Sequence, residues 1–85
     1  MVYRLEISEE ADSKFLKLRK KDKKQLIIIN KKISQILENP LHFKPLKGDM
    51  FGSRRVHVGN SFVLTYEIKE NTIRILNYDH HDKIY

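Results

Sequence analysis

Three segments of alternating apolar and polar residues in the second half of the sequence restrict its fold more than any other feature. They span Arg54 to Val58, Phe62 to Ile68 and Thr72 to Tyr78, separated by Gly59-Asn60-Ser61 and by a turn around Glu70-Asn71. A period of two bounded by turn residues predicts β-strands joined as consecutive hairpins. The resulting antiparallel sheet has one apolar face, which other parts of the chain must cover.

The length of the first hairpin loop decides which side chains share a face, because a slip of one residue exchanges the two faces of a strand. A two-residue loop would mix charged and apolar side chains on both faces. A three-residue loop gives one mainly apolar face, through the pairs Val58–Phe62, Val56–Leu64 and Arg54–Tyr66. A two-residue second turn extends this register through the pairs Ile68–Ile73, Tyr66–Ile75 and Glu67–Arg74.

The opposite face of the predicted sheet carries side chains capable of chemistry. They are Arg55, His57, Thr65, Glu67, Arg74 and Tyr78, with Tyr78 placed beside Val63. A polar sheet face often does no more than meet the solvent. Imidazole, guanidinium and phenol groups on one face would, however, supply proton donors, proton acceptors, phosphate ligands and base-stacking surfaces together.

The N-terminal part of the sequence predicts a strand followed by a helix. Residues Val2 to Ile7 alternate as a half-buried strand does, although the pattern leaves the place of this strand in the sheet open. Ser8 is a good N-cap, and a first helix is predicted to end near Arg19. The apolar side of this helix carries Ala11, Phe15 and Leu18.

A second helix is predicted from the N-cap Asp22 to Asn39, just before Pro40. Its apolar side carries Leu26, Ile29, Ile33, Ile36 and Leu37. The run Ile27-Ile28-Ile29 would also suit a strand, because β-branched residues favour strands. The helical spacing continues for three turns beyond the run, however, and favours a helix.

These elements predict an α+β fold with the order β-α-α-β-β-β, in which a helical hairpin packs on one face of an antiparallel sheet. Residues 1–85 form a single domain, because 85 residues leave no room for a second one or for a nucleotide-binding fold. Residues 40–53 contain both prolines and two of the three glycines and predict a loop. Because a domain of 85 residues is too small for a deep central cavity, any functional site must be shallow and lie on the surface.

The chain is basic, with 17 lysines and arginines against 11 acidic residues and a net charge of +6. This balance favours a polyanionic partner such as nucleic acid, an acidic protein or an anionic membrane. The predicted helices direct many lysines to water, either as a merely solvated face or as a surface that attracts RNA: Lys17, Lys20, Lys21, Lys23, Lys24, Lys31 and Lys32. The absence of cysteine and of a long apolar segment predicts a cytoplasmic protein that does not enter a membrane.

The segment Asp79-His80-His81-Asp82 raises the question of a metal site, because histidine and aspartate are good ligands. Neighbouring side chains on an extended segment point apart, and the sequence has neither a HExxH motif nor a cysteine pair. We therefore predict no metal and no other cofactor. A hydrogen-bonded or solvated tail is the alternative interpretation of this segment.

Cleavage of RNA without a metal requires a base for the 2′-hydroxyl proton, cations for the phosphorane and an acid for the leaving 5′-oxygen. Histidine suits either proton role near neutral pH, and arginine suits the phosphate. His57, His81, Arg55 and the last residue, Tyr85, are candidates to share these tasks. Composition and spacing alone do not divide the roles among them.

Four segments carry motifs that occur in a fixed order along the chain. They are Pro45-Leu46-Lys47-Gly48, Gly52-Ser53-Arg54-Arg55-Val56-His57-Val58, Phe62-Val63-Leu64-Thr65-Tyr66-Glu67-Ile68 and His80-His81-Asp82-Lys83-Ile84-Tyr85. In order, spacing and position this chain resembles the RelE/ParE superfamily of toxins from type II toxin–antitoxin systems. The resemblance covers essentially the whole chain.

Within the superfamily the pattern is most similar to the YafQ-type branch, which has histidines matching His57 and His81 and an aromatic residue matching Tyr85. As in that branch, the arginine that RelE and YoeB carry at the position of Val63 is absent. The sequence departs from the branch where Arg55 and Ser61 replace carboxylates and where a further histidine falls near Lys44.

The resemblance implies a ribosome-dependent endonuclease that enters the ribosomal A site, contacts ribosomal RNA, cleaves mRNA to a 2′,3′-cyclic phosphate and is silenced by a cognate antitoxin. It implies proton transfer by His81, phosphate contacts from His57 and Arg55, further contacts from Lys44 and Lys47, and base stacking or support of the acid by Tyr85. The remaining candidate RNA-binding residues are Arg54, Arg74, Tyr78 and His80. A ParE-like inhibitor of DNA gyrase, or a decayed toxin that only binds its antitoxin, are the alternatives.

Overall fold

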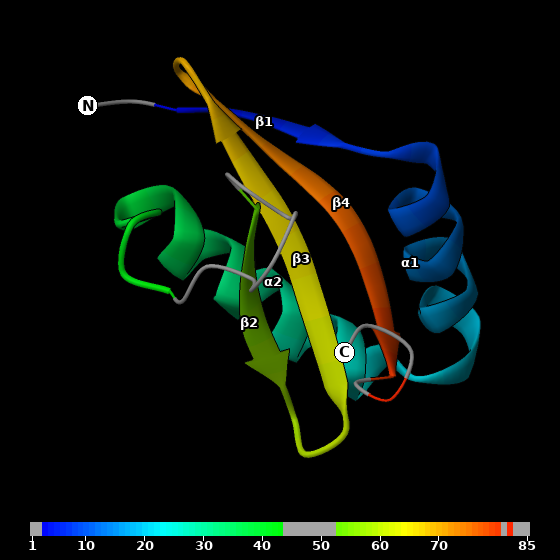
Figure 1. Cartoon of the computed structure of the whole chain (residues 1–85). Coiled ribbons are helices and arrows are strands. Elements are labelled where there is room, and N and C mark those ends of the chain that lie inside the picture. Colours follow the sequence, from blue (N-terminus) through cyan, green and yellow to red (C-terminus); the bar gives the residue numbers. More distant parts are fainter. Residues whose placement is uncertain (1–2, 44–52, 81, 83–85) are drawn as a thin grey trace.

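The computed structural model describes residues 3–43, 53–80 and 82 (Figure 1). Its elements are β1 (Arg4–Ile7), α1 (Glu9–Lys21), α2 (Lys23–Glu38), β2 (Ser53–Val58), β3 (Phe62–Lys69) and β4 (Thr72–His80). The predicted α+β class and the order β-α-α-β-β-β are confirmed. Of the predicted loop at 40–53, residue 53 belongs to β2 and residues 44–52 lie outside the described part.

The four strands form one sheet in the order β1-β4-β3-β2. The pairs β2–β3 and β3–β4 are antiparallel, as predicted, whereas β1 runs parallel to β4. The sheet is therefore mixed: the predicted antiparallel hairpins are confirmed, and β1, whose place the sequence left open, adds a parallel pair at the border. Between β1 and β4 the chain forms both helices and the β2–β3 hairpin, and β4 then lies beside β1 (Figure 1). Two parallel strands can be neighbours only when a long connection of this kind joins them.

Both helices begin at their predicted N-caps and α2 ends just before Asn39 as predicted, whereas α1 runs to Lys21, two residues beyond its predicted end near Arg19. The Ser8 hydroxyl accepts a hydrogen bond from the Ala11 N–H at 3.1 Å, which caps α1. Asp22 serves both helices, because its N–H donates to the Leu18 carbonyl at the end of α1 and its carboxylate accepts from the Gln25 N–H at 3.1 Å at the start of α2. The isoleucine run is helical, as its spacing predicted.

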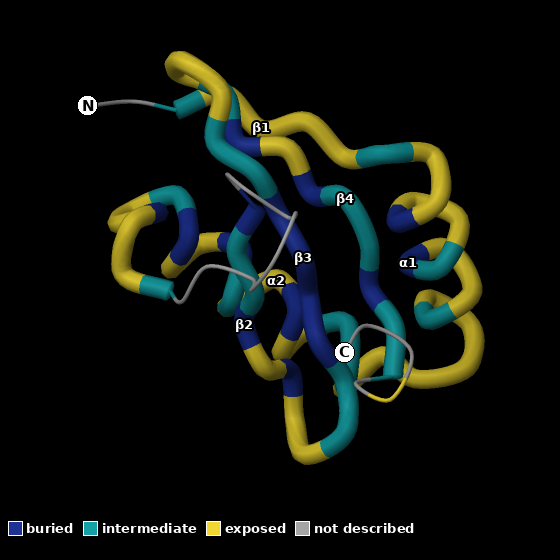
Figure 2. Tube along the Cα trace, viewed as in Figure 1, coloured by how far each residue is buried: buried dark blue, intermediate teal, exposed yellow. Residues whose placement is uncertain are grey.

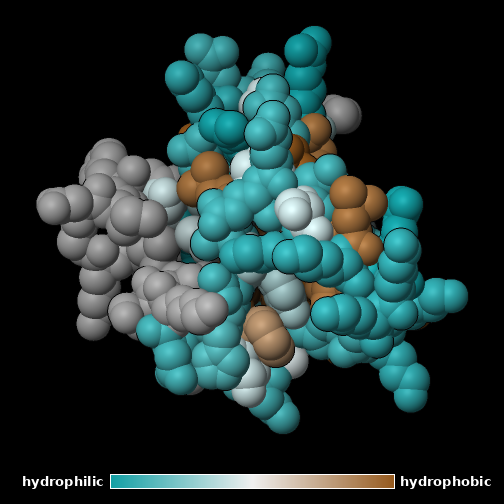
Figure 3. All heavy atoms as spheres, turned by 90° about the vertical axis from the view of Figure 1, so that its right-hand side faces the viewer, coloured by the Kyte–Doolittle hydropathy of each residue, from teal (hydrophilic) through white to brown (hydrophobic). Residues whose placement is uncertain are grey.

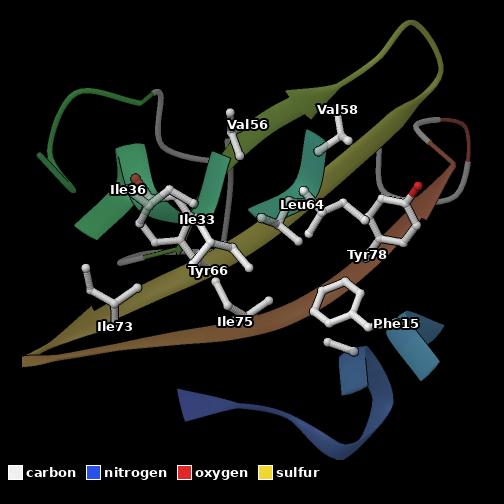
Figure 4. Close-up of a cluster of buried hydrophobic side chains, with 12 residues drawn as sticks. Phe15, Ile33, Ile36, Val56, Val58, Leu64, Tyr66, Ile73, Ile75 and Tyr78 are labelled. Carbon is white, nitrogen blue, oxygen red and sulfur yellow. The ribbon is translucent and has the colours of Figure 1, made fainter. Parts of the chain in front are cut away.

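Both helices pack on the same face of the sheet, and their apolar sides form one core with it (Figure 4). α1 contributes Ala11 and Phe15, and α2 contributes Ile29, Ile33 and Ile36. The sheet contributes Val56, Val58, Leu64, Tyr66, Ile73, Ile75 and Tyr78. β3 is buried through its middle, whereas β1 is exposed along its length (Figure 2).

Both predicted hairpin registers are confirmed, including Val58 opposite Phe62 and Glu67 opposite Arg74. The three-residue loop begins at Gly59, whose φ of 63° lies in the left-handed region that suits glycine. Beyond the second hairpin the register shifts, because Tyr66 pairs with Ile75 while Thr65 pairs with Asn77. Leu76 is thus the extra residue of a β-bulge.

The bulge reverses the expected face of Tyr78. Without it, Tyr78 would lie beside Val63 on the polar face, as predicted; with it, Tyr78 lies opposite Leu64 and is only 4% exposed. Its ring stacks on Phe62 with centroids 5.1 Å apart, and its hydroxyl accepts a hydrogen bond from the Gln25 amide at 2.7 Å. Burial raises the pKa of Tyr78, and the prediction that this residue lines the polar face was wrong.

Six of the seven helix lysines that were predicted to face water are exposed, and the seventh, Lys32, is half-buried. The surface on the α1 side is mainly hydrophilic, with separate apolar patches (Figure 3). No helix within the described ranges is long and apolar enough to cross a membrane.

Tyr66 generates a prediction about alkaline stability. Burial raises its pKa to about 12, against 10.0 ordinarily, while Arg54 partly opposes the shift. The unfolded chain therefore loses this proton first, and the free energy of unfolding should fall as the pH rises from 10 towards 12. In Tyr66→Phe the part of this decrease that the Tyr66 hydroxyl causes should vanish. Loss of its hydrogen bond to the Pro40 carbonyl should also lower the free energy of unfolding by about 1 kcal/mol at neutral pH. Urea unfolding of both chains across this range measures the difference; parallel curves above pH 10 would contradict the prediction.

Candidate nucleic-acid site

A surface hollow of about 370 Å³ lies beside β2, the strand at one border of the sheet. Its lining comes from α2, from the turn after α2 and from β2: Lys32, His42, Phe43, Arg55, Val56 and His57. Two of these, Arg55 and His57, were predicted from the sequence to be catalytic. The structure brings both into one hollow.

Alternation along β2 explains how Arg55 and His57 reach the surface. Val56 is buried in the core, so the residues on either side of it point to the face away from the helices. His57 is exposed and Arg55 is half-buried. The guanidinium of Arg54, which leaves β2 on the helix side, donates to the Phe43 carbonyl at 2.6 Å and so ties the turn after α2 to the strand.

The turn that carries His42 and Phe43 is held by several contacts. The His42 N–H donates to the Asn39 carbonyl at 3.1 Å, and the two rings meet edge to face with centroids 5.1 Å apart. Phe43 in turn meets the buried ring of Tyr66 edge to face at 6.4 Å. The imidazole of His42 is therefore exposed, and its position is held by Phe43, which contacts the core.

The hollow combines groups that suit a phosphodiester. Arg55 and Lys32 supply positive charge, His57 and His42 supply two imidazoles, and Phe43 supplies an aromatic surface. Guanidinium and ammonium groups bind phosphate, imidazoles transfer protons near neutral pH, and aromatic rings stack on unpaired bases. None of the lining residues in the described part of the chain is acidic, so the hollow favours an anionic ligand.

Sequence reasoning listed Lys32 only among the lysines of the helix surface, and it did not single out His42 or Phe43. Lys32 looks like one more member of the solvated lysine face, and only the packing of α2 beside β2 distinguishes it from Lys31. His42 and Phe43 lie in a segment with no periodicity that could fix their direction. Two sequence signals could have pointed to them: their position just before the Pro45-Leu46-Lys47-Gly48 motif, and the further histidine of the YafQ-type branch that falls near Lys44.

The side chain of His80, near the end of β4, lies on the opposite face of the sheet from those of Arg55 and His57. His80 pairs with Phe62 on the helix side, and the two rings meet at 5.6 Å. Its Nδ1 accepts from the Asp82 N–H at 3.3 Å. Lys14 of α1 holds this end of the strand through the Asn77 side chain at 2.8 Å and the Asp79 carboxylate at 3.1 Å.

Arg74 does not share the hollow either. It lies opposite Glu67 on the polar face and lines a second depression of about 280 Å³, together with Glu6, Glu70 and other residues. The acidic side chains of that depression make it a poor phosphate site.

The polar face is also closed at its centre. Val63 is fully buried and Thr65 is 4% exposed, although neither belongs to the core on the helix side. The prediction that Thr65 lines an open face was therefore wrong. The accessible groups of the face lie towards its borders, and the hollow beside β2 is one of these regions.

Four predicted site residues, Lys44, Lys47, His81 and Tyr85, lie outside the described residues. Among the residues that the structure does describe, no group of three or more histidine, aspartate or glutamate side chains is placed to hold a metal ion.

Residues 5–85 match the family described as the ParE toxin of type II toxin–antitoxin systems, parDE. An uncharacterised protein of Methanosarcina mazei is 51% identical over 86 residues, which cover 99% of this chain and 100% of that protein. A protein of Methanocaldococcus jannaschii, whose name provisionally assigns it as toxin RelE4, is 42% identical over 86 residues, covering 99% of this chain and 92% of that protein.

Solved structures show the same fold. A chain of the Escherichia coli DinJ–YafQ toxin–antitoxin complex superposes with a TM-score of 0.78, covering 100% of this chain and 99% of that chain. Its sequence is 23% identical, so the comparison establishes a common architecture.

The hollow generates a prediction about ligand binding. A short single-stranded RNA with a 2′-deoxy ribose, which blocks attack on the phosphate, should shift the imidazole NMR signals of His42 and His57 together. The His80 signal should move little, because its ring lies on the helix side of the sheet. Raising the salt concentration should reverse the shifts, because phosphate contacts release counterions. Shifts confined to His80 would contradict this site.

Proposed function

We propose that this chain, which belongs to the ParE toxin family of type II toxin–antitoxin systems within the RelE/ParE superfamily, acts as a ribosome-dependent endonuclease on mRNA. The observation that carries the proposal is the meeting of Arg55 and His57 in one basic hollow with Lys32 and His42. Lys32 and His42 lie more than ten residues before Arg55 and His57 in the sequence, and the packing of α2 beside β2 brings the four side chains into one hollow.

The reaction needs no group beyond side chains and the RNA itself. A base takes the proton of a 2′-hydroxyl, whose oxygen attacks the adjacent phosphorus while the bond to the 5′-oxygen breaks. An acid protonates that leaving oxygen, giving a 2′,3′-cyclic phosphate and a free 5′-hydroxyl. Positive groups stabilise the charge that develops on the phosphorane.

The groups of the hollow fit these tasks. Arg55 and Lys32 bind the scissile phosphate, and His57 orients it or exchanges a proton with it. His81, which follows β4 directly in the chain, is the proposed proton-transfer residue by resemblance to the YafQ branch, and Tyr85 is proposed to stack on a base or support the acid. Lys44 and Lys47 add phosphate contacts in this proposal.

A cognate antitoxin is the proposed protein partner, as in the DinJ–YafQ toxin–antitoxin complex. The net charge of +6 favours an acidic partner, and an extended antitoxin that orders on binding would supply both acidic and apolar side chains. An adjacent short reading frame that encodes such a glutamate-rich protein would support this part of the proposal.

A second candidate function is inhibition of DNA gyrase, which the resemblance to ParE-type toxins implies and which the match to the ParE toxin family favours. The two functions differ in a direct readout. The nuclease should cut the message in a translating extract and leave plasmid supercoiling by gyrase intact, whereas the gyrase inhibitor should do the reverse.

Mapped message ends in cell-free translation test the nuclease. His57→Ala and His81→Ala should each lower the cleavage rate at least about a hundredfold, as expected when a proton-transfer group is removed. Lys32→Ala should lower it about tenfold or more, through loss of a charge-assisted phosphate contact.

Lys31→Ala is the matched control, because Lys31 is the exposed neighbour of Lys32 on α2 and does not line the hollow. Circular dichroism confirms that each variant is folded. Equal loss of cleavage in the Lys31 and Lys32 variants, or an intact message with the unaltered chain, would refute the proposal in this form.

A further inference from the structure

β1 is exposed to a degree that its place in the sheet does not explain. It lies at the border opposite β2, and all four of its residues are exposed (Figure 2). Leu5 and Ile7 pair with Ile73 and Ile75, which are fully buried, yet they are themselves 41% and 40% exposed. Parallel strands are usually covered on both faces, so the exposure of leucine and isoleucine on β1 is unusual.

The backbone of β1 also faces outward on its second side. The N–H groups of Arg4 and Ser8 donate to the carbonyls of Asn71 and Ile75, at 2.7 Å and 2.9 Å. Alternate residues of a strand direct their N–H and C=O groups to the same side, so those of Leu5 and Ile7 point away from β4. Within the described part of the chain no strand pairs with that side.

The side chains of β1 make it complementary to itself. In an antiparallel pair of two copies, residues directly opposite each other point to the same face. A pair centred on Arg4 would oppose two arginines, and one centred on Glu6 would oppose two glutamates. A pair centred on Leu5 instead opposes Arg4 to Glu6 twice on one face and gathers only apolar and aromatic side chains on the other.

This third arrangement satisfies the backbone as well. The two Leu5 residues would exchange both of their outward N–H···O=C bonds, and Tyr3 would do the same with Ile7 of the second copy. Arg4 and Glu6 would form the intervening non-hydrogen-bonded pair, in which side chains lie closer together. A register shifted by one residue would set inward-facing backbone groups opposite outward-facing ones and is excluded.

We infer that β1 binds the β1 strand of a second copy of this chain, in the antiparallel register centred on Leu5. The two four-stranded sheets then form one continuous sheet with two-fold symmetry. α1 leaves room for the second copy, because it begins beyond the end of β1 and packs against β4 (Figure 1).

Charge reversal at two positions tests the register. The chain is short enough at 85 residues for chemical synthesis, and sedimentation equilibrium measures the dimer affinity. At about 0.15 M salt the repulsion between two chains of charge +6 is partly screened. Arg4→Glu and Glu6→Arg should each weaken the dimer about tenfold or more, because each turns two attractive cross-strand pairs into repulsive ones.

An equimolar mixture of the two variants provides the matched control. In a heterodimer the chain with two glutamates faces the chain with two arginines, so the affinity should return to within about threefold of the unaltered chain. Methylation of the Leu5 backbone nitrogen should abolish the dimer without disturbing the pairing with β4, because this N–H points outward.

A mixture that does not restore the affinity would overturn the inference, as would an unaltered chain that stays monomeric at millimolar concentration. Dimers unaffected by N-methyl-Leu5 would do so too, because they would use another surface. None of these outcomes depends on RNA cleavage, so failure here and failure of the proposed function are distinguishable.

Discussion

Three parts of the fold meet at Ser8. Its N–H extends the pairing of β1 with β4, its hydroxyl oxygen caps α1, and the same hydroxyl donates to the Leu76 carbonyl at 2.7 Å. One residue thus joins the end of a strand, the start of a helix and the bulge in β4. The direction of α1 relative to the sheet, and therefore the covering of the core, depends on this junction.

The bulge beside this junction divides β4 into two parts with different neighbours. Before Leu76, β4 is flanked by β1 and β3; after it, α1 replaces β1 as the neighbour through Lys14. The change of register turns Tyr78 into the core, where it contacts Phe15 with ring centroids 5.9 Å apart. A residue that the alternation assigns to the polar face therefore becomes the contact between α1 and the sheet.

The particular residues show why some features could be predicted from the sequence and others could not. The caps at Ser8 and Asp22 and both hairpin registers depend on residues close in the chain, so local patterns determine them. The bulge at Leu76 involves Ser8, which is 68 positions away, and Leu76 itself carries no turn signal. No local pattern could have revealed it.

The candidate site was predictable only in part for the same reason. Arg55 and His57 alternate with buried residues on a strand, so the sequence assigned them a common direction. Lys32 and His42 reach the same hollow because α2 packs beside β2 and because Arg54 and Tyr66 hold the turn that follows α2. These are tertiary contacts, and they become visible only with coordinates.

The two border strands of the sheet differ in how well they are protected against the addition of another strand. β2 has cationic side chains and a hollow beside it, which disfavour addition of another strand and suit a polyanion. β1 has only one charge of each sign and exposes leucine and isoleucine, so it lacks this protection. Because β1 and β2 lie at opposite borders, a second copy on β1 would leave the hollow beside β2 accessible. The proposed self-association and the proposed phosphate binding thus use separate surfaces, so a mutation on one surface should leave the other function intact.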